Sequence, residues 1–142
     1  MADSTALASL RYQWRALERG ERGLDEASFE KALVGWMAEH RSSHVPFLAS
    51  REGTPIGMAW LAVVERIPGP EFFARRSAYI QSTYVVAEER SAGVGSELVR
   101  RALEHARELR LDYVAVHPSE RAFSLYKRVG FSKIGNVMEL RL

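Results

Sequence analysis

The sequence has 142 residues, of which 46% are hydrophobic and 27% charged, with a formal net charge of +2 and no cysteine. This length suits one domain spanning residues 1–142, and no apolar stretch reaches the roughly 18 residues of a membrane span. The absence of cysteine excludes disulfides, thiolate metal sites and a cysteine nucleophile, and we expect no metal site. Without a run of basic residues, the composition gives no argument for nucleic acid as a partner.

The N-terminal segment lacks the basic stretch and apolar core of a secretory signal, so we expect a soluble, cytoplasmic protein. Apolar residues recur every three or four positions over residues 5–19, which predicts an amphipathic helix. The same period from Phe29 predicts a second helix that ends near His40. Trp14 and Trp36 lie on the apolar faces of these helices and are expected in the core.

A hairpin and a central strand are predicted next. Residues 45–50 and 56–67 flank the segment REGTP, whose glycine and proline mark a turn between antiparallel strands. The loop PGPEFFARRS follows, and its two adjacent phenylalanines indicate a lid or a contact surface. Residues 77–86 are rich in β-branched and aromatic side chains, which predicts a central strand.

The C-terminal half predicts a parallel strand pair joined by a helix. Residues 94–109 carry apolar side chains on one face and charged side chains on the other, as expected of an amphipathic helix. Residues 111–118 predict a short buried strand, parallel to the central one because a helix connects the two. Ser119 can cap a short helix that ends at Gly130, and the weakly alternating tail suggests a closing hairpin. The whole chain thus predicts one mixed α/β sheet domain.

The segment RSAGVGSEL lies between the central strand and the amphipathic helix. A helix N-terminus has unpaired N–H groups and partial positive charge, and Gly93 and Gly95 give an anion access to them. The glycines are equally compatible with a simple strand-to-helix turn. A Walker loop is disfavoured because no Lys-Ser/Thr pair follows, and a Rossmann fingerprint is disfavoured because Leu98 occupies the third glycine position.

Two linked motifs carry a family resemblance. Residues 90–95 fit the pattern Arg/Gln-x-x-Gly-x-Gly/Ala, and AFSLYKRVGF at residues 122–131 fits A-x-x-L-Y-x-x-x-G-F. At this spacing the chain resembles the GNAT-type N-acetyltransferase superfamily. The resemblance implies a central, mixed, twisted sheet with helices on both faces, here with the family's first strand missing or vestigial. The open sheet edge that results can be filled by a partner subunit, as in a homodimer.

The resemblance also implies a binding site for acetyl-coenzyme A, used as a co-substrate without a metal. The central strand would offer main-chain groups to the pantetheine arm, and the glycine loop would face the pyrophosphate. The serine before the last short helix stands where the family often has asparagine. The implied cofactor-binding residues are Thr83, Tyr84, Val85, Arg90, Ser91, Ala92, Gly93, Val94, Gly95, Ser96 and Ser119.

Tyr126, in the second motif, is implied as the general acid that protonates the thiolate leaving group. The resemblance does not identify the general base, because the stretch SAYIQS carries no carboxylate where some family members have a glutamate. Glu65 on the predicted hairpin is the candidate, with an ordered-water route as the alternative.

The sequence thus favours an acetyl-coenzyme A-dependent N-acetyltransferase acting on a primary amine of a small molecule or protein. The first two helices and the loop PGPEFFARRS would wall the acceptor cleft. The alternative is a non-catalytic domain that binds coenzyme A or acetyl-coenzyme A as a sensor or regulator.

Overall fold

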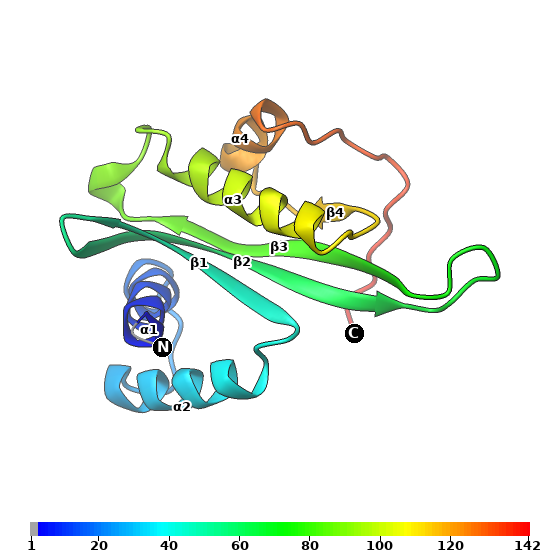
Figure 1. Cartoon of the computed structure of the whole chain (residues 1–142). Coiled ribbons are helices and arrows are strands. Elements are labelled where there is room, and N and C mark those ends of the chain that lie inside the picture. Colours follow the sequence, from blue (N-terminus) through cyan, green and yellow to red (C-terminus); the bar gives the residue numbers. More distant parts are fainter. Residues whose placement is uncertain (1–2) are drawn as a thin grey trace.

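The computed structural model describes residues 3–142, which form a four-stranded sheet between two layers of helices (Figure 1). The strands follow one another in space in the order β1-β2-β3-β4; the first two pairs are antiparallel and the third is parallel. This arrangement confirms the predicted mixed sheet. The strands are β1 (His44–Arg51), β2 (Thr54–Arg66), β3 (Arg75–Val85) and β4 (Val114–Val116).

Helices lie on both faces of the sheet, as predicted (Figure 1). One layer contains α1 (Ser4–Tyr12), which continues as a π-helix (Gln13–Glu18), and α2 (Glu26–Glu39); the other contains α3 (Val94–Glu108) and α4 (Phe123–Arg128). Short 3₁₀ turns occupy Ala87–Glu89 and Glu120–Ala122. In the N-terminal part that the structure describes, helices precede β1 and no strand does, which agrees with the missing first strand.

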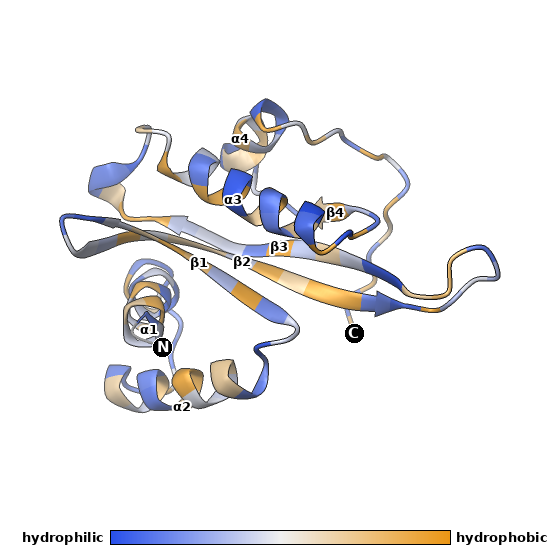
Figure 2. Ribbon diagram, viewed as in Figure 1, coloured by the Kyte–Doolittle hydropathy of each residue, from blue (hydrophilic) through white to orange (hydrophobic). Residues whose placement is uncertain are grey.

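Each face of the sheet has its own core. Leu61 and Ile80 face α3, where Val99 and Ala102 are fully buried. Met58 and Trp60 face the opposite way, against Leu7 and Leu10 of α1. Because β2 is covered on both faces, every residue from Ile56 to Ala62 is buried, and its sequence is a continuous apolar run rather than an alternating one. Figure 2 shows that the surface of α3 turned away from the sheet is hydrophilic.

The turn between β1 and β2 is formed by Glu52 and Gly53, which have φ of 50° and 80°. Two consecutive left-handed residues define the hairpin turn whose twist matches the strands, and glycine adopts that conformation most easily. The predicted turn is therefore confirmed, although Pro55 belongs to β2.

Two predictions for the C-terminal half need correction. The strand expected over 111–118 is reduced to β4, and the hairpin predicted in the tail is wrong, because residues 131–142 form no strand. The tail has only the short edge of β4 to pair with, and its Ile134 and Met138 are 71% and 95% exposed. A strand gains little from pairing when its apolar side chains remain in water.

None of the helices within residues 3–142 is long and apolar enough to cross a membrane.

Gly57 in β2 lies where two layers meet closely. A Cβ atom at this position would lie 3.1 Å from the Leu98 side chain and 3.1 Å from the Tyr84 carbonyl oxygen, which is backbone and cannot turn away. We expect Gly57→Ala to lower the free energy of unfolding by about 1–3 kcal/mol, measured by urea denaturation.

The matched control is Gly35→Ala in α2, where a Cβ would meet nothing within 4 Å. Because alanine favours the helix interior, this control should be more stable by about 0.5–1 kcal/mol. Equal effects at the two glycines would contradict the close packing of β2 against α3.

Candidate functional site

A β-bulge interrupts the central strand β3. Trp60 pairs with Gln81 and Met58 with Tyr84, so Ser82 and Thr83 together lie opposite the single residue Ala59. Ser82 has φ of 57°, a left-handed conformation that is unusual for a residue with a side chain. The bulge reverses the alternation of the strand: Gln81 and Ser82 both face the α1–α2 layer, while Thr83 faces α4.

The pairing between β3 and β4 stops just before the bulge. The parallel pairing reaches Ile80, opposite Val116, and ends there. Val86 N–H donates to the Ile56 carbonyl at 2.9 Å, so beyond the bulge the even-numbered residues turn their main-chain groups to β2. The main-chain groups of Thr83 and Val85 therefore face the other side, where β4 has ended.

Tyr126 meets the bulge from α4. Its hydroxyl donates to Thr83 Oγ1 at 3.0 Å, and its ring packs edge-on against Phe131 with ring centres 5.5 Å apart. The side chain is buried, and burial raises the pKa of Tyr126 above its usual value, although the bond to Thr83 opposes this. The phenol therefore holds its proton at neutral pH, at the point where β3 and β4 separate.

The glycine loop presents its main chain without protein acceptors. Ser91 and Gly93 have φ of 68° and 84°, and Gly93 occupies the N-cap position of α3 without a side-chain cap. Within residues 3–142, the N–H groups of residues 91–96 have no hydrogen-bond partner, and the first bond of the helix runs from Glu97 N–H to the Gly93 carbonyl. Such a cluster of free N–H groups at a helix start binds anions.

Two residues of this loop have a packing role as well. A Cβ at Gly95 would lie 2.9 Å from Leu125 Cδ1, so this glycine lets α3 approach α4. Ser96 is buried. Gly93 differs, because a Cβ there would meet no protein atom within 4 Å. Ala92, Gly93 and Val94 also line a cavity of about 520 Å³ beside the β1–β2 hairpin.

Arg90 is engaged within the protein. Its Nε donates to the Val85 carbonyl at 2.9 Å, and its Nη2 pairs with Glu18 Oε2 at 3.0 Å. Glu18 also accepts from the Tyr84 hydroxyl at 2.5 Å, and burial together with this carboxylate raises the pKa of Tyr84 to about 12. Arg90 and Tyr84 thus join the glycine loop and β3 to the π-helix, and the Tyr84 side chain points away from α4.

Two basic residues of α4 and the predicted groups Ser119 and Glu65 lie outside this arrangement. Lys127 and Arg128 are exposed on α4, where Arg128 donates to Ser124 Oγ at 3.3 Å. Ser119 is exposed and occupies an N-cap position without a side-chain cap. Glu65 pairs with Arg76 near the other end of the strands, roughly 20 Å from Thr83 at about 3.3 Å per residue. Glu65 is therefore too distant to act as the base.

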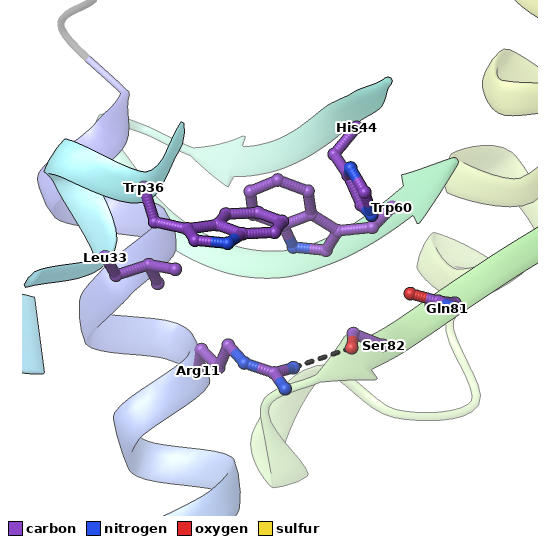
Figure 3. Close-up of a pocket in the computed structure, with 7 residues that line it drawn as sticks. All are labelled: Arg11, Leu33, Trp36, His44, Trp60, Gln81 and Ser82. Carbon is purple, nitrogen blue, oxygen red and sulfur yellow. Dashed lines mark hydrogen bonds between the residues drawn. The ribbon is translucent and has the colours of Figure 1, made fainter. Parts of the chain in front are cut away.

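A pocket of about 360 Å³ lies on the opposite face of the bulge (Figure 3). The two helices contribute from one side, while β1, β2 and the bulge contribute from the other. The residues that line the pocket are Arg11, Leu33, Trp36, His44, Trp60, Gln81 and Ser82. The bulge thus lies between Tyr126 on one face and a ligand-sized pocket on the other.

The expectation that Trp36 lies in the core is wrong. It is 38% exposed and lines the pocket rather than filling the core, because Met37 and Leu33 provide the apolar contacts of α2. Trp14 does pack on the core, stacked on Tyr84 with ring centres 5.6 Å apart. Phe72 and Phe73 are 64% and 78% exposed on the loop between β2 and β3.

Arg11 and His44 are pocket residues that the sequence reasoning missed. Arg11 follows Leu7 by four positions and precedes Trp14 by three, so it places a charge within the apolar stripe of the first helix. This interruption could have identified Arg11 from the sequence. Nothing in the sequence marks His44 as a pocket residue. Its place depends on how β1 packs against α2, which brings its ring beside Trp36 with ring centres 4.8 Å apart.

Burial and the nearby His40 lower the pKa of His44 below its usual value. Its Nδ1 lies 2.9 Å from Ser43 Oγ, and the His40 ring is 5.8 Å away between centres. The imidazole is therefore neutral at physiological pH and can accept a proton in the pocket.

The sequence model of the acetyltransferase (GNAT) family matches residues 9–131 of the chain. This match confirms the resemblance inferred from the glycine loop and the Tyr126 motif. A comparison with curated proteins found no match.

Solved structures similar to this chain include a predicted acetyltransferase from Clostridium acetobutylicum with acetyl-CoA, at 22% identity, TM-score 0.79, and coverage of 99% of this chain and 91% of that one. A GCN5-related N-acetyltransferase from Ralstonia eutropha matches at 23% identity, TM-score 0.72, and coverage of 98% and 93%. A Trypanosoma brucei acetyltransferase matches at 21% identity, TM-score 0.74, and coverage of 99% and 94%. At these identities the likeness shows the shared fold.

The lowered pKa of His44 predicts a pH-dependent stability. The unfolded chain has a histidine pKa of about 6.5, so the unfolded state binds this proton more readily than the folded state does. The stability is complete above that value and falls as the pH drops toward the lower folded pKa. Urea denaturation from pH 7.5 to 5 should show a smaller fall for His44→Gln than for wild type.

His117→Gln serves as the control, because His117 is exposed beyond the end of β4. It should follow the wild-type pH dependence. A His44→Gln protein that loses as much stability as wild type over this range would show that His44 is not protonated more readily on unfolding.

Proposed function

Because the chain belongs to the acetyltransferase (GNAT) family, we propose that it transfers the acetyl group of acetyl-coenzyme A to a primary amine of a small molecule or protein. The observation that carries this proposal is the β-bulge, which has a buried, protonated tyrosine on one face and a pocket on the other. Donor and acceptor can meet there through the gap beyond β4. The GCN5-related N-acetyltransferase fold of the Ralstonia protein supports an amine acceptor.

The main chain fits acetyl-coenzyme A. The unpartnered N–H groups of residues 91–96 suit its pyrophosphate, and the left-handed Gly93 leaves them open. The main-chain groups of Thr83 and the N–H of Val85, which face away from β2, suit the amide groups of the pantetheine arm, as an added strand would. When bound, the thioester supplies the acetyl carbon that the amine attacks and the sulfur that departs.

Tyr126 is proposed to give its proton to the departing sulfur when the carbon–sulfur bond breaks. The raised pKa keeps the phenol protonated, so it acts as a donor rather than as a base. Thr83 Oγ1 fixes the direction of the hydroxyl. A thiolate with a conjugate acid near pKa 8.5 is a weaker base than a tyrosinate, so this transfer depends on positioning.

His44 is proposed to replace Glu65 as the group that takes the amine proton, directly or through water. It is neutral, and it lies on the wall of the pocket where the acceptor would bind. A neutral amine is needed for attack, because a protonated amine has no lone pair. The amine proton therefore goes to His44 in the pocket, and the proton for the departing sulfur comes from Tyr126 on the opposite face of the sheet.

The alternative function is a domain that binds coenzyme A or acetyl-coenzyme A without turnover. Release of free thiol from acetyl-coenzyme A in the presence of a panel of amines separates the two functions. A cytoplasmic location and a homodimer formed through the open edge of β1 belong to the proposal as well.

Tyr126→Phe tests the acid. Loss of the hydroxyl should lower kcat by about 100-fold or more, since general acids typically contribute that factor. The affinity for acetyl-coenzyme A should stay within about twofold, because the Tyr126 hydroxyl bonds to Thr83 and not to the glycine loop. The measurements are thiol release and isothermal titration calorimetry.

Thr83→Val is the matched variant, because it removes the partner of the hydroxyl and leaves the hydroxyl itself. It should lower kcat less than Tyr126→Phe does. A Tyr126→Phe protein with full activity at every pH tested would contradict the assignment of Tyr126 as the acid.

A further inference from the structure

The pocket in Figure 3 contains a cation without an acidic partner. Arg11 is half-buried on α1, and within the part of the chain that the structure describes it forms no ion pair. Burial and the charge of Arg15 lower the pKa of Arg11, while the charge of Glu21 partly offsets them. A partly buried guanidinium without a paired carboxylate is less favourable than one in water, so an anionic occupant would stabilise it.

A second donor on the pocket wall also lacks a partner. Trp60 is 6% exposed, and its Nε1 is buried without any hydrogen-bond acceptor among residues 3–142. In Figure 3 this nitrogen is on the edge of the indole that is turned toward Arg11. Buried donors in proteins are nearly always paired, so an unpaired one beside a cavity indicates a ligand that carries an acceptor.

Apart from His44, Gln81 and Ser82, the rest of the pocket lining is apolar and aromatic. Leu33 and Trp36 from α2 and Trp60 from β2 line the same pocket (Figure 3). No acidic residue of the described chain lines the pocket. The pocket therefore suits one anionic group and one apolar group, and it offers no carboxylate to bind a second positive charge.

The position of Arg11 fixes how far the anionic group lies from the reacting amine. Its Nη1 donates to Ser82 Oγ at 2.6 Å, so the guanidinium touches the bulge itself. In the proposed reaction the amine reaches the acetyl group at this bulge. An anion held by Arg11 is therefore adjacent to the amine, within a few bonds of it.

We propose that the acceptor is an amino-acid-like small molecule, with a carboxylate two or three bonds from its primary amine and an apolar or aromatic side chain. Arg11 binds the carboxylate, and Trp36 and Trp60 contact the side chain. The inference that this ligand is acetylated rests on the proposed function. The inference that the pocket binds it does not. Arginine binds carboxylates with two parallel hydrogen bonds, which gives both affinity and direction.

The experiment compares three probes that share one ring. Phenylalanine carries both the amine and the carboxylate, phenethylamine lacks the carboxylate, and 3-phenylpropionate lacks the amine. Thiol release from acetyl-coenzyme A gives kcat/KM for the two amines, and calorimetry gives the binding of all three. Wild type should prefer phenylalanine to phenethylamine at least tenfold in kcat/KM and should bind 3-phenylpropionate.

The variants separate binding of the carboxylate from support of the bulge. Arg11→Gln should reduce the preference for phenylalanine at least tenfold, mainly through KM, and should lose 3-phenylpropionate binding. Arg11→Lys should restore part of the preference, because it keeps the charge. Arg22→Gln, in the exposed connection before α2, should behave as wild type.

Each result decides the inference. A wild type that acetylates phenethylamine as well as phenylalanine, or an Arg11→Gln protein that keeps the preference, overturns it and leaves the proposed function intact. Failure of wild type to bind any probe also overturns it. If wild type binds phenylalanine through Arg11 but releases no thiol, the inference about the ligand stands and the proposed transfer fails.

Discussion

The β-bulge at Ser82 and Thr83 is the constraint on which the rest of the site depends. By inserting one residue opposite Ala59, it turns Ser82 toward one helical layer and Thr83 toward the other. It also lies just beyond the last residue that pairs with β4. Without the extra residue the alternation of β3 would continue, and Ser82 would face the layer of α3 and α4 while Thr83 faced the layer of α1 and α2. The bulge therefore connects the tyrosine on one face with the pocket on the other.

Glu18 links the N-terminal helical layer to the loop that follows β3. The π-helix places this carboxylate where it accepts from the Tyr84 hydroxyl and pairs with Arg90, while Arg90 also holds the Val85 carbonyl. Hydrogen bonds to charged groups are stronger than neutral ones, so this network sets the position of the glycine loop relative to the pocket. Arg90 is thus held by protein acceptors at both Nε and Nη2.

The sequence predicted the elements whose signals are local. The helical periods, the Glu52-Gly53 turn and the glycines of the 93–95 loop all reflect backbone preferences of neighbouring residues. The bulge could not be predicted, because it depends on how β3 pairs with β2, which is a contact between distant segments. The pocket role of His44 likewise depends on contacts between distant segments. The hairpin predicted in the tail is wrong because the weakly alternating residues there have no long strand edge to pair with.

The most direct test is calorimetric titration of acetyl-coenzyme A into wild type, Gly93→Val and Gly53→Val. Both glycines are left-handed, with φ of 84° and 80°, and a Cβ at either would meet no protein atom within 4 Å, so the two variants carry a similar backbone strain. We predict that wild type and Gly53→Val bind with similar affinity and that Gly93→Val, still folded by its melting curve, binds at least tenfold more weakly. Equal affinity of the two variants, or no binding by wild type, would contradict the claim that bare main chain at residues 91–96 holds the phosphates.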